Sequence, residues 1–144
     1  MNPSRTFIHF LSSSPEETIA IGRFLAPRFL PGHILAIEGD LGTGKTTLIK
    51  GLAAHCSAAL VNSPTFTYLQ IYEGVPPLFH FDLYRLKEAQ EFIQMGFTDY
   101  FQQQGICCIE WSERIESLLP QNAIHIRLEH IEENKRKISI YELE

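Results

Sequence analysis

The chain has 144 residues, the length of one ordinary domain. Hydrophobic residues make up 44% and charged residues 20%, which excludes a disordered or fibrous protein. Acidic residues outnumber basic ones by 17 to 12, for a net charge of −5 with neutral histidines. A domain that grips nucleic acid through phosphates is therefore disfavoured, because that grip needs clustered lysines and arginines.

Neither the start of the chain nor any internal run predicts a membrane or secreted protein. No apolar run approaches the about 18 residues of a membrane span, and residues 1–5 lack the apolar core of a signal peptide. The three cysteines match neither a disulfide framework nor a C-x-x-C metal site, and the six histidines are scattered without ligand spacing. We expect a cytoplasmic protein with small, reduced core cysteines.

The first third of the chain predicts a strand, a helix, a buried strand and a second helix. Ser14 followed by Pro15, with Glu17 three residues after the cap, is typical of a helix start. Pro31 and Gly32 are expected to end this helix. The third element is continuously apolar, as in a strand buried on both faces. The four elements are expected at 7–11, 15–30, 34–37 and 44–53.

The rest of the chain predicts a hairpin, short helices and three further strands. Two strand-like segments flank the turn-rich residues 73–77, and a second continuously apolar run ends at Glu110. Ser112 is expected to cap a helix. The last two segments alternate apolar and polar residues, as half-buried antiparallel strands do. Strands are expected at 65–72, 78–84, 106–109, 124–128 and 138–143, and helices at 86–95, 98–104 and 112–119. Without a linker or repeat, residues 1–144 predict one α/β domain.

A glycine-rich segment follows the first buried strand and fits the pattern G-x-x-x-x-G-K-[ST]. Its glycines lack the Cβ atoms that would block a backbone wrapping a phosphate, and its amides with the following helix N-terminus favour anionic oxygens. Lys45 is placed to contact the β- and γ-phosphates, and the Thr46 hydroxyl to ligate Mg²⁺. The expected nucleotide-binding residues are Gly39, Asp40, Leu41, Gly42, Thr43, Gly44, Lys45, Thr46 and Thr47.

A nucleotide-hydrolysing site also needs an acidic group at a neighbouring strand end. Glu110 ends a buried strand, where ligand groups gather in a parallel sheet, and Asp82 lies in the apolar run 78–83. Either could instead be a solvated carboxylate. Hydroxyls of the proline-stiffened residues 63–67, Thr65 among them, could sense a γ-phosphate, although a structural turn explains them almost as well. Trp111 is interpreted as core or interface packing.

Several classes of nucleotide-binding protein lack support in this sequence. A guanine-specific GTPase usually carries N-K-x-D, but Asn134 and Lys135 are followed by arginine and lysine. The L-S-G-G-Q signature of transporter ATPases is absent. A small-molecule kinase normally needs a lid and arginines for the phosphoryl acceptor, and a chain of 144 residues with few arginines after the loop leaves little room for either. A small kinase and a nucleotide-gated binding module without turnover remain the alternatives to an ATPase.

Four motifs in this order resemble the TsaE (YjeE) family of small bacterial P-loop ATPases. They are the loop at 39–47, Ser-Pro-Thr-Phe at 63–66, His-Phe-Asp-Leu-Tyr-Arg-Leu at 80–86, and Glu-Trp at 110–111. The third is the most distinctive, and the resemblance covers nearly the whole chain. It implies a P-loop NTPase-like three-layer fold whose central sheet is mostly parallel, with antiparallel additions from the hairpin and the C-terminal strands.

The resemblance also implies a function and a set of roles. Such proteins support threonylcarbamoyladenosine modification of tRNA as Mg-dependent ATPases that work with a TsaB–TsaD complex, and the partners hold most of the tRNA. Thr46 and Glu110 would ligate Mg²⁺, and Asp82 would fill the second acidic position. Lys45, Asp82 and Glu110 would act in hydrolysis. Arg136, expected in a solvated basic turn from the residues alone, would lie near the nucleotide base.

Overall fold

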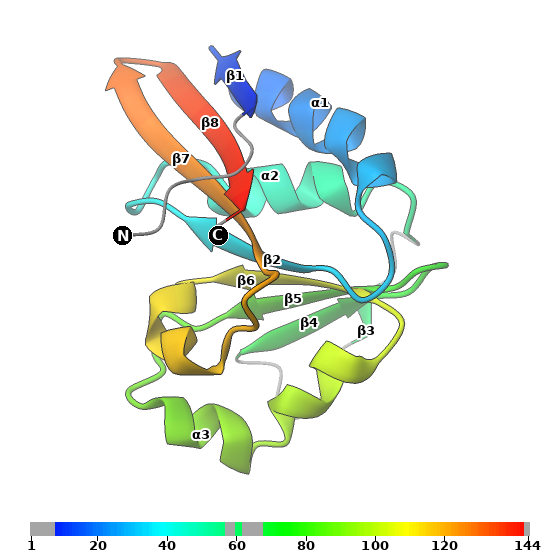
Figure 1. The fold of residues 1–144 in the computed structure, drawn as a ribbon. Helices are drawn as coiled ribbons and strands as arrows, with labels where there is room; N and C mark the ends of the chain where they lie inside the picture. The colour runs from blue at the N-terminus through cyan, green and yellow to red at the C-terminus, as the bar shows by residue number, and fades with distance from the viewer. Residues whose placement is uncertain (1–7, 57–59, 62–67, 143–144) are drawn as a thin grey trace.

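The structure is a computed structural model that describes residues 8–56, 60–61 and 68–142 (Figure 1). Strands and helices are interspersed along the chain, as expected for an α/β protein. In chain order the elements are β1 (Ile8–Ser12), α1 (Pro15–Leu25), the 3₁₀ helix η1 (Ala26–Arg28), β2 (Ile34–Glu38), α2 (Lys45–Leu52), β3 (Leu60–Val61), β4 (Leu69–Tyr72), β5 (Leu78–Asp82), α3 (Ala89–Gln94), η2 (Phe97–Gln102), β6 (Ile106–Glu110), η3 (Ser112–Leu118), β7 (Ile124–Glu132) and β8 (Lys135–Glu142).

One mixed sheet joins the eight strands of the described residues in the order β1-β8-β7-β2-β6-β5-β4-β3. The two continuously apolar runs, β2 and β6, are neighbours at its centre and pair in parallel. Parallel pairing extends to β7 on one side and β5 on the other, whereas the outer strands on both sides pair antiparallel. The predicted parallel character thus holds for the four central strands. The predicted hairpin (β4–β5) and the C-terminal antiparallel pair (β7–β8) are confirmed.

Helices cover both faces of the sheet, which gives three layers (Figure 1). Successive side chains of a strand point to opposite faces, and β2 shows this directly. Leu35 and Ile37 pack into a core cluster with α1 and α2, whereas Ile34 packs into a second cluster with α3, η2 and η3. The second cluster is rich in aromatic residues, among them Phe81 and Phe92, whose ring centroids lie 5.3 Å apart. The buried central strand β2 ends at the edge of the sheet where the candidate site lies.

Helix α1 begins where the sequence predicts but ends earlier. The Ser14 hydroxyl accepts a hydrogen bond from the Glu17 amide at 3.1 Å, as an N-cap does. The helix was expected to continue to residue 30, and this prediction is wrong, because the α-helix ends at Leu25. Pro27 explains the difference, since it has no amide hydrogen to continue the helical hydrogen bonds, although Ala26 before it still has α geometry.

The helices α1 and α2 touch through two glycines. A Cβ built on Gly22 would lie 2.6 Å from the Leu48 carbonyl oxygen and 2.9 Å from the Gly51 Cα. Gly51 is equally crowded by α1. Only glycine allows this close approach, so the two helices pack as one layer over the sheet.

Further local predictions need correction. Residues 97–102 and 112–118 form 3₁₀ helices, and Trp111, with φ 60°, occupies the cap position expected for Ser112. The basic run that includes Arg136 lies in β8 and not in a turn, because the two-residue turn is at 133–134, where Asn134 has φ 65°. Strand β3 was not predicted. The segment 62–67, which contains the candidate Thr65, lies outside the described residues.

The cysteines are free thiols, as expected. Cys107 and Cys108 are buried in β6, and burial raises the pKa of the Cys107 thiol to about 12 and that of Cys108 well above its usual value. Both therefore act as inert core residues. Within the described ranges, every helix is too short or too polar to cross a bilayer.

Candidate functional site

The glycine-rich loop connects β2 to α2 in a conformation that its glycines permit. Gly39 has φ 150°, and a Cβ there would lie 2.6 Å from the Leu128 carbonyl oxygen of β7. Gly44 caps α2 in the left-handed region with φ 100°. Between them Thr43, which is buried, donates its hydroxyl to the Asp40 carbonyl oxygen at 2.8 Å. The loop thus makes a tight turn that ends at the amino terminus of α2, where the first amides lack partners within the helix.

Lys45 is the first residue of α2, and its ammonium group lies back over the loop. Nζ donates to the Gly39 carbonyl oxygen at 2.6 Å and lies 3.9 Å from the centroid of the Trp111 ring. Only 5% of Lys45 is exposed. The hydrogen bond and the cation–π contact together hold the positive charge of Lys45 beside the turn. At this place the charge can stabilise an anion bound by the loop.

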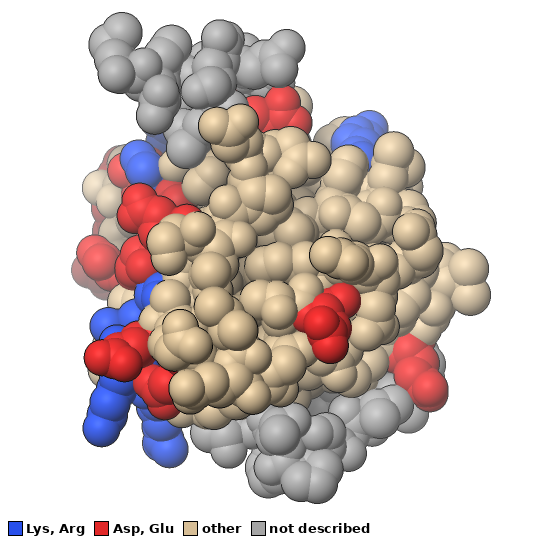
Figure 2. Space-filling model, turned by 60° about the horizontal axis from the view of Figure 1, so that its bottom comes forward, with Lys and Arg blue, Asp and Glu red and all other residues tan. Residues whose placement is uncertain are grey.

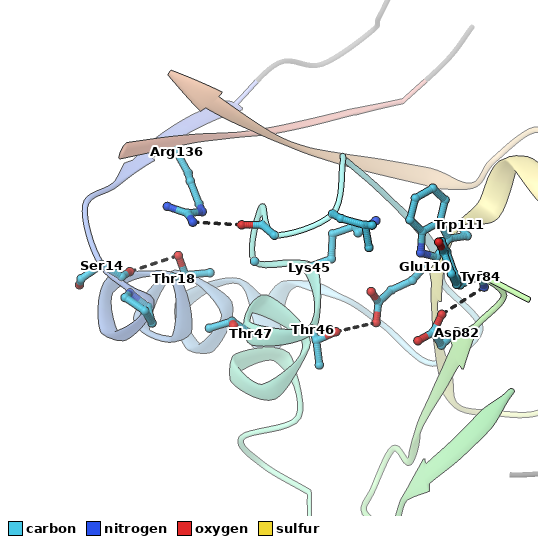
Figure 3. A pocket seen from close by; sticks show the side chains of 14 residues that line it. Ser14, Thr18, Lys45, Thr46, Thr47, Asp82, Tyr84, Glu110, Trp111 and Arg136 are labelled. Atoms are coloured by element: carbon cyan, nitrogen blue, oxygen red, sulfur yellow. Dashed lines mark hydrogen bonds between the residues drawn. The ribbon is translucent and has the colours of Figure 1, made fainter. Parts of the chain in front are cut away.

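Glu110, at the end of β6, is the carboxylate that directly contacts this helix. Its Oε2 atom accepts a hydrogen bond from the Thr46 hydroxyl at 3.0 Å (Figure 3) and a second one from His80 Nε2 at 2.6 Å. Burial opposes ionisation, but the bonds from His80 and Thr46 and the nearby charge of Lys45 hold the pKa of Glu110 below its usual value. An ionised carboxylate and a hydroxyl are therefore held in contact next to the glycine-rich loop.

Asp82 ends the neighbouring strand β5 and pairs in register with Glu110. It is more exposed than Glu110, and its Oδ1 accepts a hydrogen bond from the Tyr84 amide at 3.2 Å. The parallel register thus brings the two predicted carboxylates to the same edge of the sheet. Glu110 contacts Thr46 directly, whereas Asp82 faces the cavity from the next strand.

Arg136 closes the other end of the site. It lies on β8, and its Nη2 atom donates to the Gly42 carbonyl oxygen at 3.0 Å. Ser14 and Thr18, at the start of α1, lie at this same end of the site (Figure 3). The basic residue that was expected near a nucleotide base is therefore in contact with the loop itself.

These groups surround a cavity of about 440 Å³, within the usual range of small-molecule sites. Most of the predicted residues line it: Leu41, Gly42, Gly44, Lys45, Thr46, Thr47, Asp82, Glu110 and Arg136. The remaining loop residues Gly39, Asp40 and Thr43 shape the turn behind it. The lining residues that sequence reasoning did not assign to the site are Ser14, Pro15, Thr18, Tyr84 and Trp111. Trp111, interpreted from the sequence as packing, contacts Lys45.

His80 lies in the third sequence motif, but the sequence alone does not assign it a role. Strand periodicity could have identified it, because residues two apart on a strand share a face, and His80 is two residues before Asp82. His80 is 5% exposed, and its Nδ1 atom has no hydrogen-bond partner among the described residues. Its Nε2 atom holds the Glu110 carboxylate in place.

The donor set suits a cation that is only partly held by protein. No cluster of three or more His, Cys, Asp or Glu side chains that could bind a metal ion occurs in the described part of the chain. Mg²⁺ is usually held by one or two carboxylates together with phosphate oxygens and water. The paired Thr46 and Glu110 oxygens, with Asp82 nearby, fit that requirement.

A glycine-rich loop between a buried strand and a helix, a Lys-Thr pair at the helix start and a carboxylate on the adjacent strand define a P-loop-type protein. The family model "Threonylcarbamoyl adenosine biosynthesis protein TsaE" matches residues 12–138. The chain belongs to the TsaE family.

Individual proteins agree with this assignment. The chain is similar to the tRNA threonylcarbamoyladenosine biosynthesis proteins TsaE of Bacillus subtilis, with 43% identity covering 88% of this chain and 80% of the relative, and of Treponema pallidum, with 34% identity covering 90% and 97%. The crystal structure of Bacillus subtilis YdiB superimposes with a TM-score of 0.79 at 35% identity, covering 99% of this chain and 87% of that one.

Proposed function

We propose that the protein binds Mg-ATP in this cavity and hydrolyses it as an accessory ATPase for threonylcarbamoyladenosine modification of tRNA. Residues 1–144 then form one P-loop NTPase domain that acts in the cytoplasm. Membership of the TsaE family supports the pathway. The observation that carries the nucleotide chemistry is the contact between the Thr46 hydroxyl and the Glu110 carboxylate beside Lys45.

In this proposal the loop and α2 bind the triphosphate. The loop amides and the positive end of the helix dipole face the phosphate oxygens, and Lys45 adds a full charge. Its ammonium has three donors, so one can keep the Gly39 carbonyl bond while the others turn to phosphate. Arg136, with Ser14 and Thr18, lies at the end left for the nucleoside.

Thr46 and Glu110 would hold the magnesium ion, with Asp82 as the second acidic group. The ion, when bound, neutralises charge that develops on the phosphate oxygens. Glu110 suits this role because its hydrogen bonds keep it ionised although it is buried. His80 and Thr46 both donate to Oε2, which keeps the carboxylate turned toward Thr46.

Turnover by the isolated chain should be slow. Arg136 is the one arginine among the residues that line the described cavity, and it lies at the loop rather than between the two carboxylates. A TsaB–TsaD-type complex would complete the site. Figure 2 shows a face of the molecule whose centre is largely uncharged, while acidic and basic side chains lie together along its left edge, and this supports a protein partner at the uncharged part and tRNA contact through the partners.

A steady-state ATPase assay tests the proposal. We expect little phosphate release by the chain alone and a clear increase when TsaB and TsaD are added. Brisk hydrolysis that ignores both partners would contradict the accessory role. Tight ATP binding without hydrolysis in the assembled complex would instead indicate a nucleotide-gated binding module, and transfer of the phosphoryl group to a metabolite would indicate a kinase.

A further inference from the structure

A second polar cluster lies on the other side of the loop from the nucleotide cavity. Glu38, the last residue of β2, points away from α2, into a separate cavity of about 450 Å³ between η3 and the strands β7 and β8. Around its carboxylate gather His125, Arg127 and Tyr141, and we call these four residues the Glu38 cluster. Glu38, His125 and Tyr141 do not line the nucleotide cavity.

The register of three adjacent strands brings these side chains together. Arg127 of β7 is paired with Glu38 of β2, and Tyr141 of β8 is paired with His125 of β7. The rings of His125 and Tyr141 are stacked at 5.3 Å with an angle of 16° between their planes. Strand pairing and ring stacking therefore hold the donor groups of His125, Arg127 and Tyr141 in place around the Glu38 carboxylate.

Both carboxylate oxygens of Glu38 are hydrogen-bonded. Oε1 accepts from the Tyr141 hydroxyl at 2.7 Å and from Arg127 Nη2 at 3.4 Å, and Oε2 accepts from His125 Nδ1 at 2.9 Å. Burial opposes ionisation, but the bonds from His125 and Tyr141 hold the pKa of Glu38 below its usual value. The end of β2 is thus anchored by an ionised side chain with several fixed donors.

The residue after this anchor starts the glycine-rich loop. The Gly39 carbonyl oxygen is the acceptor for Lys45 Nζ, and Gly39 itself is wedged against the Leu128 carbonyl and the Thr43 hydroxyl. The peptide between Glu38 and Gly39 is restrained on one side by the hydrogen bonds of the Glu38 side chain and on the other by this packing. It therefore has little freedom to rotate. The direction of the Gly39 carbonyl, and with it the place of the Lys45 ammonium, depends on both.

We propose that Glu38 is a positioning residue for nucleotide binding: its hydrogen bonds to His125, Arg127 and Tyr141 hold the start of the loop so that Lys45 faces the bound phosphates. This inference rests on the proposed nucleotide site, but it assigns a role to residues outside that site. It requires that disrupting the Glu38 cluster lowers the affinity of the folded protein for Mg-ATP, and does not only lower the stability of the fold.

Nucleotide affinity of Glu38→Gln and Tyr141→Phe tests the inference. We expect the Kd for Mg-ATP, measured by calorimetry, to rise about tenfold for Glu38→Gln and about fivefold for Tyr141→Phe. Because the two changes act on the same contact, Glu38→Gln by neutralising its acceptor and Tyr141→Phe by removing its donor, the double variant should bind only slightly more weakly than Glu38→Gln. The matched control is Glu116→Gln, which removes the same charge from an exposed position in the same cavity and should leave the Kd unchanged.

A second measurement on the protein without nucleotide separates positioning from stability. Amide hydrogen exchange in residues 39–45 should speed up in both cluster variants and not in Glu116→Gln, at a temperature where urea titration shows each variant to be folded. Wild-type affinity and wild-type exchange in folded Glu38→Gln and Tyr141→Phe would overturn the inference. If one variant does not fold, the other decides. If the wild-type chain itself does not bind Mg-ATP, the proposed function fails, and the exchange data alone judge the cluster.

Discussion

Replacing Glu110 by glutamine keeps the size and shape of the side chain but removes its negative charge. Thr46 and His80 both donate to the same oxygen, Oε2, so the glutamine carbonyl can replace it without moving either partner. The change therefore isolates the charge of Glu110 from its packing. The fold should survive it, because both donors keep an acceptor.

The magnitudes follow from these two bonds and from the expected role. A hydrogen bond to a charged acceptor contributes about 1 kcal/mol more than one to a neutral acceptor. With two such bonds, Glu110→Gln should lower the free energy of unfolding by about 2 kcal/mol. The loss is reduced by the desolvation cost of the buried charge, which the variant no longer has. Hydrolysis in the assembled complex should fall by about 10²–10³, as when a group that stabilises transition-state charge is removed. ATP affinity without magnesium should not fall, because removing a negative charge near Lys45 does not oppose phosphate binding.

Three measurements check this prediction together. They are urea unfolding, calorimetric ATP binding with and without Mg²⁺, and phosphate release with the partner complex. Magnesium should strengthen ATP binding clearly in the wild type and much less in Glu110→Gln. The control is again Glu116→Gln, which should match the wild type in all three. Wild-type hydrolysis by Glu110→Gln would refute the reasoning that this carboxylate holds the metal ion.

Other substitutions and one titration test the remaining contacts. Lys45→Ala should weaken nucleotide binding about 100-fold in calorimetry, since it removes the charge beside the turn, and an unchanged Kd would remove Lys45 from the site. Gly39→Ala should lower the free energy of unfolding by about 2 kcal/mol, because its Cβ would meet the Leu128 carbonyl oxygen, and a stability equal to the wild type in urea would show that the loop adapts. Burial and the Glu38 carboxylate raise the pKa of Tyr141 to about 12. Because the folded pKa is the higher one, its contribution to stability is complete below the ordinary tyrosine pKa of about 10 and is lost as the pH rises toward 12. Ultraviolet titration of the wild type and Tyr141→Phe should show one tyrosine fewer ionising in that range.

Local signals in the sequence predicted the elements that carry the site. Continuous apolar runs identified β2 and β6, and their burial explains why no alternation is visible. The helix start at Ser14 and the loop that ends at Lys45 depend on short-range patterns that a sequence displays directly. Because the carboxyl ends of parallel strands meet at one edge, Asp82 and Glu110 could also be expected to lie close together.

What the sequence did not predict depends on contacts between distant residues. Lys45 and Trp111 meet only because β2 and β6 are neighbours, and nothing near Trp111 shows that its backbone takes a left-handed conformation. Arg136 was assigned to a turn because three basic residues in a row look solvated, whereas pairing with β1 and β7 makes them strand. Hydrogen bonding with neighbours in the sheet outweighed the local preference.

The glycine contact between α1 and α2 has a consequence for the breadth of the nucleotide site. At its Arg136 end the cavity is lined by Ser14 and Thr18 at the start of α1 and by the loop that leads into α2. The spacing of these two helices is set at Gly22 and Gly51. One methyl group at either position would wedge the pair apart and carry Ser14 and Thr18 outward with α1. In the proposed nucleotide site, a buried substitution at Gly22 or Gly51 would therefore widen the end near Arg136 and leave the glycine-rich loop unchanged.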